Sequence, residues 1–210
     1  MDRRAALKNI GISAGFIAVT PTFISLLQSC TNEYAITWIP ELLSLEEAKA
    51  LDRIVDLIIP ETDIPGAKAL NVPMLIDKYA SQVASPEEAQ FFKAGAGIML
   101  KELGVTEEKP IDDISAETHD ALLAKYLKQP KEKQREYREQ MAQITSPEDF
   151  EAMPEVITFN FLAAVRDISI YAYKNTEYVG EKVLAYLPVP GEQKGCAPLE
   201  DLTGGKAWSL

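Results

Sequence analysis

Apolar residues recur at helical spacing along much of the chain, and polar cap residues mark where helices begin. Ser44 and Glu47 form a capping-box pattern, in which the hydroxyl accepts from a helical N–H and the carboxylate reaches back to the cap. The apolar positions that follow this cap are Leu45, Ala48, Leu51, Val55 and Ile58. The pattern predicts a helix that ends at Ile59, just before Pro60.

Two more helices are predicted directly downstream. Asn71-Val72-Pro73 opens the first of them, because proline is favoured in the first helical turn. Its predicted inward face is formed by Met74, Leu75, Tyr79 and Val83. Ser85-Pro86-Glu87-Glu88 opens the next helix, and its apolar stripe is formed by Ala89, Phe92, Ala96, Met99, Leu100 and Leu103.

The second half of the chain has the same character. Ser115 caps a stretch that contains the apolar residues Ala121, Leu122 and Leu127. Residues 130–140 are polar almost all round, which is typical of a solvated helix. Ser146-Pro147-Glu148-Asp149 is predicted to cap the longest apolar segment, Val156 through Tyr173, as the central helix of a bundle. The predicted fold is therefore mainly α, an irregular helical bundle with a long extended C-terminal tail and no substantial sheet.

Two segments do not have a helical pattern. Residues 58–67 contain two prolines and a glycine, and form either a plain helix connection or a functional loop. Prolines and glycines are predicted to prevent regular structure throughout the tail, residues 186–210. The tail is either a frayed end or a binding segment, because it also carries the large apolar residues Tyr186, Leu187, Val189, Leu199, Trp208 and Leu210.

The N-terminus has the layout of an export signal. Arg3, Arg4 and Lys8 form a basic region, and no charged residue follows from Asn9 through Ser29. The alternative is an uncleaved N-terminal anchor. It is disfavoured because the apolar run is interrupted by Gly11, Gly15, Thr20 and Pro21.

Two patterns refine this interpretation. Arg3-Arg4-Ala5-Ala6-Leu7-Lys8 resembles a twin-arginine signal. Leu27-Gln28-Ser29-Cys30 resembles a bacterial lipobox, although Gln28 is bulkier than usual at its position. Acyl chains on Cys30 would anchor the mature protein at the periplasmic face of a bacterial membrane. The predicted organisation is an export signal at 1–29, a lipid-anchored linker at 30–43, a helical domain at 44–185 and a partner-binding tail at 186–210.

Charge and composition exclude several classes of protein. The 210 residues include 21 basic and 32 acidic side chains, a net charge of −11, which disfavours nucleic acid as a partner. Removing residues 1–29 leaves 18 basic and 31 acidic side chains, a net charge of −13, so membrane attachment must come from the lipid. One histidine and two cysteines are too few for the usual structural zinc site or a Cys-ligated iron–sulfur cluster. Glycine-rich nucleotide-binding fingerprints are also missing, so we expect no cofactor and no metal in this chain.

Catalytic candidates are few. His119 lies in the acidic first turn of a predicted helix and is expected at the surface. Asp63 has no second acid, base or metal ligand in its motif, so a turn-forming role is expected. Cys196 has only Lys194 as a basic neighbour, which favours an inert or interface-buried thiol. We therefore expect no catalytic residue in this chain.

The two non-helical segments carry a family resemblance. The run from Ile54 to Ala67, followed by Val72-Pro73 and Ile76-Asp77, resembles the signature of the gluconate 2-dehydrogenase subunit 3 family. The tail is similar to the C-terminal signature of that family through Tyr186 to Gly191, Gly195-Cys196 and Lys206 to Leu210. The twin-arginine start is also typical of the family, whereas a lipidated Cys30 departs from its usual pattern.

The resemblance implies a role for the chain. It implies a small, cofactor-free subunit bound to a large flavin-dependent dehydrogenase of the glucose–methanol–choline type, with FAD in that partner and often a separate cytochrome c subunit. The small subunit would supply the export signal. Partner contact is expected at Pro60, Asp63, Pro65, Gly66, Tyr186, Pro188, Pro190, Gly191, Cys196 and Trp208. The alternative is a stand-alone binding or scaffold lipoprotein, and a self-sufficient enzyme is disfavoured for want of catalytic groups.

Overall fold

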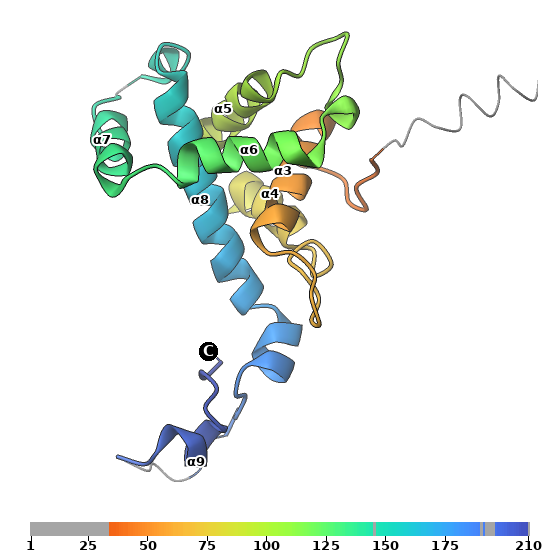
Figure 1. The fold of residues 1–210 in the computed structure, drawn as a ribbon, viewed down its shortest axis with the longest axis vertical. Helices are drawn as coiled ribbons and strands as arrows, with labels where there is room; N and C mark the ends of the chain where they lie inside the picture. Colours follow the sequence, from red (N-terminus) through yellow and green to blue (C-terminus); the bar gives the residue numbers. More distant parts are fainter. Residues whose placement is uncertain (1–33, 145, 190, 192–195, 210) are drawn as a thin grey trace, which may run out of the picture. The chain divides into compact units, whose positions relative to one another are not determined.

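In the computed structural model, which describes residues 34–144, 146–189, 191 and 196–209, the predicted helices form a bundle (Figure 1). Helix α3 (Leu45–Ile58) begins at the capping box, where the Glu47 carboxylate accepts from the backbone N–H of Ser44 at 2.7 Å. It ends at Ile58, one residue before the predicted end, with Ile59 as its C-cap ahead of the proline. The mainly α fold is confirmed.

The segment before α3 is tied to the bundle by one buried carboxylate. Asp77 is fully buried, and its two oxygens accept from the backbone N–H groups of Glu41, Leu42 and Leu43 at 2.6–3.3 Å. Trp38 and Leu43 lie in the hydrophobic core. Residues 38–43 of the predicted linker at 30–43 are thus packed against the helices.

Helix α4 (Val72–Gln82) is present, but its predicted inward face is wrong. Val72, Ile76 and Ala80 are the buried stripe, whereas Leu75, Tyr79 and Val83 are 50%, 48% and 66% exposed. Both stripes have helical spacing, so the pattern of apolar residues could not select between them. Asp77 decides the outcome, because its carboxylate must face the backbone of residues 41–43.

Helix α5 (Pro86–Leu103) has the predicted capping box at Ser85 and buries Phe92, Ala96, Met99 and Leu103. It approaches the last long helix closely because Gly95 has no side chain. A Cβ there would lie 2.7 Å from the Phe161 ring. The rings of Phe92 and Phe161 then meet with their centroids 5.1 Å apart.

Three short elements complete the middle of the chain. They are the 3-10 turn η1 (Ile111–Asp113), helix α6 (Ala116–Leu127) and helix α7 (Lys131–Met141). Ser115 caps α6 as predicted. Helix α7 is the expected solvated helix except for Tyr137, which is buried and stacks near Phe159 at 5.2 Å between ring centroids.

Helix α8 (Pro154–Lys174) is the central helix and contacts α3, α4, α5, α6 and α7 (Figure 1). Its predicted cap is wrong, because the segment after Ser146 forms a separate 3-10 turn, η2 (Pro147–Phe150), and α8 begins after Met153. Pro154 stands in the first turn of α8, where its fixed φ favours a new helix start.

The chain leaves the bundle after α8 through η3 (Val179–Val183), a π-helical turn, and the short helix α9 (Leu199–Thr203). Among the described residues, β pairing is confined to one isolated bridge between Ala185 and Trp208. No helix among the residues that the structure describes combines the length and apolar character needed to cross a bilayer.

Candidate partner-binding site

The proline loop, residues 60–71, joins α3 to α4 and is held by its own backbone. The N–H of Ala67 donates to the carbonyl of Ile59 at 3.0 Å, and the N–H of Thr62 donates to that of Ile64 at 3.1 Å. These bonds fix both the base and the tip of the loop without any regular element. The loop is therefore a defined structure rather than a slack connection.

Gly66 makes this conformation possible. A Cβ at this position would lie 2.6 Å from the Glu61 nitrogen and 2.9 Å from the Ile59 carbonyl oxygen. Backbone atoms cannot move aside as the end of a side chain can, so only glycine fits. The glycine in the sequence motif thus has a steric explanation.

Tyr173, in the last turn of α8, ties the loop to the bundle. Its hydroxyl donates to the carbonyl of Pro65 at 2.8 Å. Burial raises the pKa of Tyr173, so the hydroxyl keeps its proton and remains a donor at neutral pH. The sequence analysis missed this residue, because no local pattern links a tyrosine to a carbonyl 108 positions earlier.

The tip of the loop is exposed and acidic. Pro60, Glu61, Thr62 and Asp63 are all exposed. The Asp63 carboxylate accepts from the hydroxyl of Thr62 at 3.1 Å, a local contact of the kind expected for a turn. The loop therefore presents a fixed polar edge to any protein that binds there.

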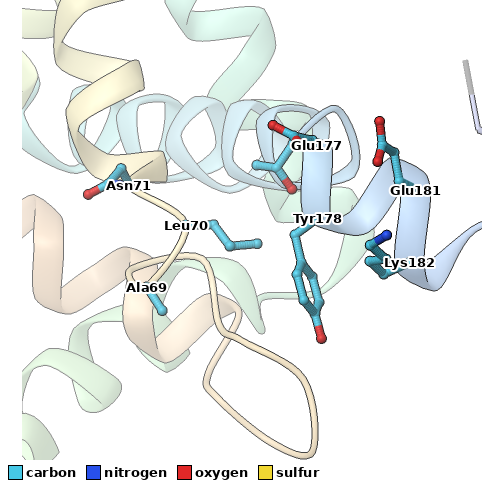
Figure 2. Close-up of a pocket in the computed structure, with 8 residues that line it drawn as sticks. Ala69, Leu70, Asn71, Glu177, Tyr178, Glu181 and Lys182 are labelled. Atoms are coloured by element: carbon cyan, nitrogen blue, oxygen red, sulfur yellow. The ribbon is translucent and has the colours of Figure 1, made fainter.

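An open hollow of about 360 Å³ separates the proline loop from η3 (Figure 2). Leu70 and Asn71 line it from the loop, while Tyr178 lines it from the residue before η3, and Glu181 and Lys182 line it from η3 itself. Asn71 has a left-handed backbone with φ 57°, a conformation that asparagine tolerates better than most residues. A second hollow of about 280 Å³ is lined by residues of η3 and by Tyr186 and Ser209 of the tail. Residues of η3 thus border both hollows, the first together with the loop and the second together with the tail.

The tail, residues 186–210, folds back to its own start. The N–H of Ala185 donates to the carbonyl of Ala207, and the N–H of Ser209 donates to the carbonyl of Ala185, both at 2.9 Å. The prediction that no regular element forms is wrong for Leu199–Thr203, which is α9. This one turn precedes Gly204, whose φ of 61° suits a helix C-cap.

Large apolar side chains of the tail remain in solvent. Trp208 is 46% exposed and Val189 is 78% exposed. Tyr186, Leu187 and Leu199 are exposed as well. The tail therefore does not bury these groups against the helices of this chain, and they form apolar surface that a partner would cover.

The other predicted site residues are scattered. Pro65 is half-buried, and Pro188 and Gly191 are exposed. Cys196 is exposed with φ 53°, so its thiol is not buried within this chain. Pro190, the lipidation residue Cys30 and the signal residues Arg3 and Arg4 lie outside the described residues.

His119 was expected at the surface, and this is wrong. Its side chain is fully buried, with Nδ1 donating to the carbonyl of Ser115 at 2.8 Å and Nε2 without a hydrogen-bond partner. Burial lowers the pKa of His119; the hydrogen bond to the Ser115 carbonyl opposes this shift, and the nearby Arg53 guanidinium adds to it. The residue is neutral at pH 7 and is enclosed by the fold. Within the described ranges, no three His, Cys, Asp or Glu side chains gather as a metal site would require.

The profile of gluconate 2-dehydrogenase subunit 3 matches residues 45–191. This match covers more than half of the chain, so the chain belongs to the gluconate 2-dehydrogenase subunit 3 family, whose members are accessory subunits of a dehydrogenase complex. The match includes the proline loop and Tyr186 to Gly191, and it ends before Cys196 and Trp208. Neither the search of curated proteins nor that of solved structures gave a match.

Proposed function

We propose that this chain is the non-catalytic accessory subunit of a periplasmic flavin dehydrogenase of the glucose–methanol–choline type. The partner would hold FAD and oxidise a sugar, a sugar acid or a polyol, with a cytochrome c subunit as electron acceptor. Membership of the gluconate 2-dehydrogenase subunit 3 family carries this proposal. The chain would add an export signal at Arg3-Arg4 and a lipid tether at Cys30.

The proline loop and the tail are the proposed contact regions. Gly66 and the Tyr173 hydroxyl hold the loop in one conformation, so binding would not have to order it. The exposed Trp208 offers the kind of large aromatic group that often dominates binding energy. A fixed polar edge and an apolar anchor on either side of η3 would orient a large partner.

The deciding experiment is purification of the tagged full chain from detergent-solubilised membranes. We expect one large flavoprotein to co-purify in a fixed ratio, identified by its peptide masses and its FAD absorbance. The isolated subunit should be colourless and should reduce no acceptor dye with any sugar. Purification of the chain alone, without a flavoprotein, would favour the stand-alone lipoprotein.

Export and anchoring need separate tests. Changing Arg3 and Arg4 together to lysine should leave both subunits in the cytoplasm if the partner travels on this signal. Normal export of the dehydrogenase in that variant would reject shared export. Intact-mass analysis of the membrane form should give a chain that starts at an acylated Cys30, and an unmodified Cys30 would contradict the tether.

A further inference from the structure

An apolar groove lies between α4, α5 and α8, and no residue of the proline loop or the tail lines it. Its volume is about 250 Å³. Tyr79 and Ala84 line it from α4 and the turn after it, Phe91 from α5, and Ala164 and Ile168 from α8. Glu88 is the one charged residue in the lining. The groove can therefore accept apolar side chains but offers a negative charge at the start of α5.

A stripe of exposed apolar residues extends the groove along α4. Leu75, Tyr79 and Val83 follow one another at intervals of four and are each about half exposed or more. The neighbouring stripe of α4, which contains Val72, Ile76 and Ala80, is in the core, so this helix buries only part of a broad apolar surface. Adjacent apolar groups of this size, left in water, indicate an interaction surface.

We propose that this groove and the Leu75-Tyr79-Val83 stripe form a second docking surface for the large subunit, which inserts an apolar segment with a lysine or arginine placed opposite Glu88. This inference rests on the proposed function. It adds a contact surface to the loop and the tail.

The negative charge of the groove and of the whole chain favours a partner with a basic residue over a second copy of this chain. The lining contains a carboxylate and no basic group, and the whole chain has a net charge of −11. Two copies of this chain that docked groove to groove would bring their Glu88 carboxylates and their negative surfaces together, which is unfavourable. A partner with a basic residue beside its apolar anchor is complementary.

The extent of the family match supports the same occupant. All residues of the groove and stripe lie within residues 45–191, whereas Trp208 lies beyond the match. Association with a larger dehydrogenase complex is the property of the family. A contact surface common to its members must therefore lie within the matched residues, as the groove does.

The test compares binding of the co-purified flavoprotein to full-length variants. Tyr79→Glu places a charge on the exposed rim, and Ala84→Trp fills the groove. Each should weaken binding about thirtyfold, as loss of a central anchor does. The matched control is Ile39→Glu, because Ile39 is 86% exposed and does not line the groove, and this variant should bind normally. Circular dichroism and thermal unfolding establish that each variant is folded, and Tyr79→Glu remains informative if Ala84→Trp is not.

A conservative change tests the charge. Glu88→Gln keeps an oxygen that can accept from the backbone N–H of Ser85, and removes the negative charge. We expect binding to weaken about fivefold at low salt, with a smaller difference at high salt. Unchanged binding at low salt would overturn the basic-residue assignment.

The outcomes separate this inference from the proposed function. If the wild-type chain captures no flavoprotein, the proposed function fails. If it captures the flavoprotein and both groove variants do so equally well, the groove inference alone is overturned. Self-association of the wild-type chain that Tyr79→Glu abolishes, with flavoprotein binding unchanged, would assign the groove to a second copy and also overturn it.

Discussion

The proline loop and the tail have similar compositions and different structures. Both are rich in proline and glycine, but the loop is held by its own backbone, by the buried Gly66 and by the Tyr173 hydroxyl. The tail folds back to its own start at the Ala185–Trp208 bridge and leaves its large side chains exposed. Such a composition excludes long helices, but hydrogen bonds and close packing decide whether a segment is held in one conformation.

The largest effect on stability is expected for Gly66→Ala. The new Cβ would overlap backbone atoms of Ile59, Pro60 and Glu61, so the loop must shift, at a cost of about 3 kcal/mol in the free energy of unfolding. Urea unfolding of the isolated subunit measures this. Gly97→Ala in α5 is the control, because its Cβ would meet only the Glu47 carboxylate oxygen at 3.6 Å and alanine favours the helix. Equal stability of the two variants would show that the loop is not constrained at Gly66.

Lowering the pH tests the stability of the helical bundle that carries the loop, through the buried His119. Because His119 has a folded pKa below its ordinary value of 6.5, the unfolded chain binds the proton more readily. Stability should therefore fall as the pH drops below about 6.5, by up to about 1.4 kcal/mol per pH unit until the folded pKa is reached. Unfolding of wild type and His119→Gln from pH 8 to 5 isolates this contribution. A slope that persists unchanged in His119→Gln would assign it to other groups.

Tyr173→Phe removes the hydrogen bond that joins α8 to the loop and keeps the aromatic ring. The expected loss of stability is about 1 kcal/mol, because the Pro65 carbonyl loses its donor. Thermal unfolding measures the loss, and amide exchange at Ala67 should accelerate if the loop loosens. Tyr171→Phe, in the same turn of α8 with an exposed side chain, is the control. Identical melting curves for the two variants would argue against the clamp.

The smallest effect on stability is expected in the tail. Trp208→Ala, or a chain that ends at Ala185, should change the melting temperature of the isolated subunit little, since the tail apolar groups are already exposed. Capture of the flavoprotein should fall about thirtyfold if Trp208 is an anchor. Full capture by the shortened chain would remove the tail from the interface and leave the loop and groove as the contact regions.

Local signals in the sequence determined much of the secondary structure. The helix starts at Ser44, Ser85 and Ser115 each depend on a side chain and a backbone group three residues apart, so the sequence alone specifies them. Ser146 shows the limit of such signals, because the following residues form η2 and α8 starts at Pro154. A cap pattern indicates where a turn can begin but not how far the helix extends.

Three other features required the tertiary structure. The inward stripe of α4, the burial of His119 and the bond from Tyr173 to Pro65 each join parts of the chain that are distant in sequence or have two equivalent local solutions. The sequence by itself determined most of the helices, the caps at Ser44, Ser85 and Ser115 and the family signature around Gly66, because these depend on neighbouring residues. Tertiary contacts decided which faces became core and which remained open for a partner, because burial depends on what the rest of the chain brings to each face.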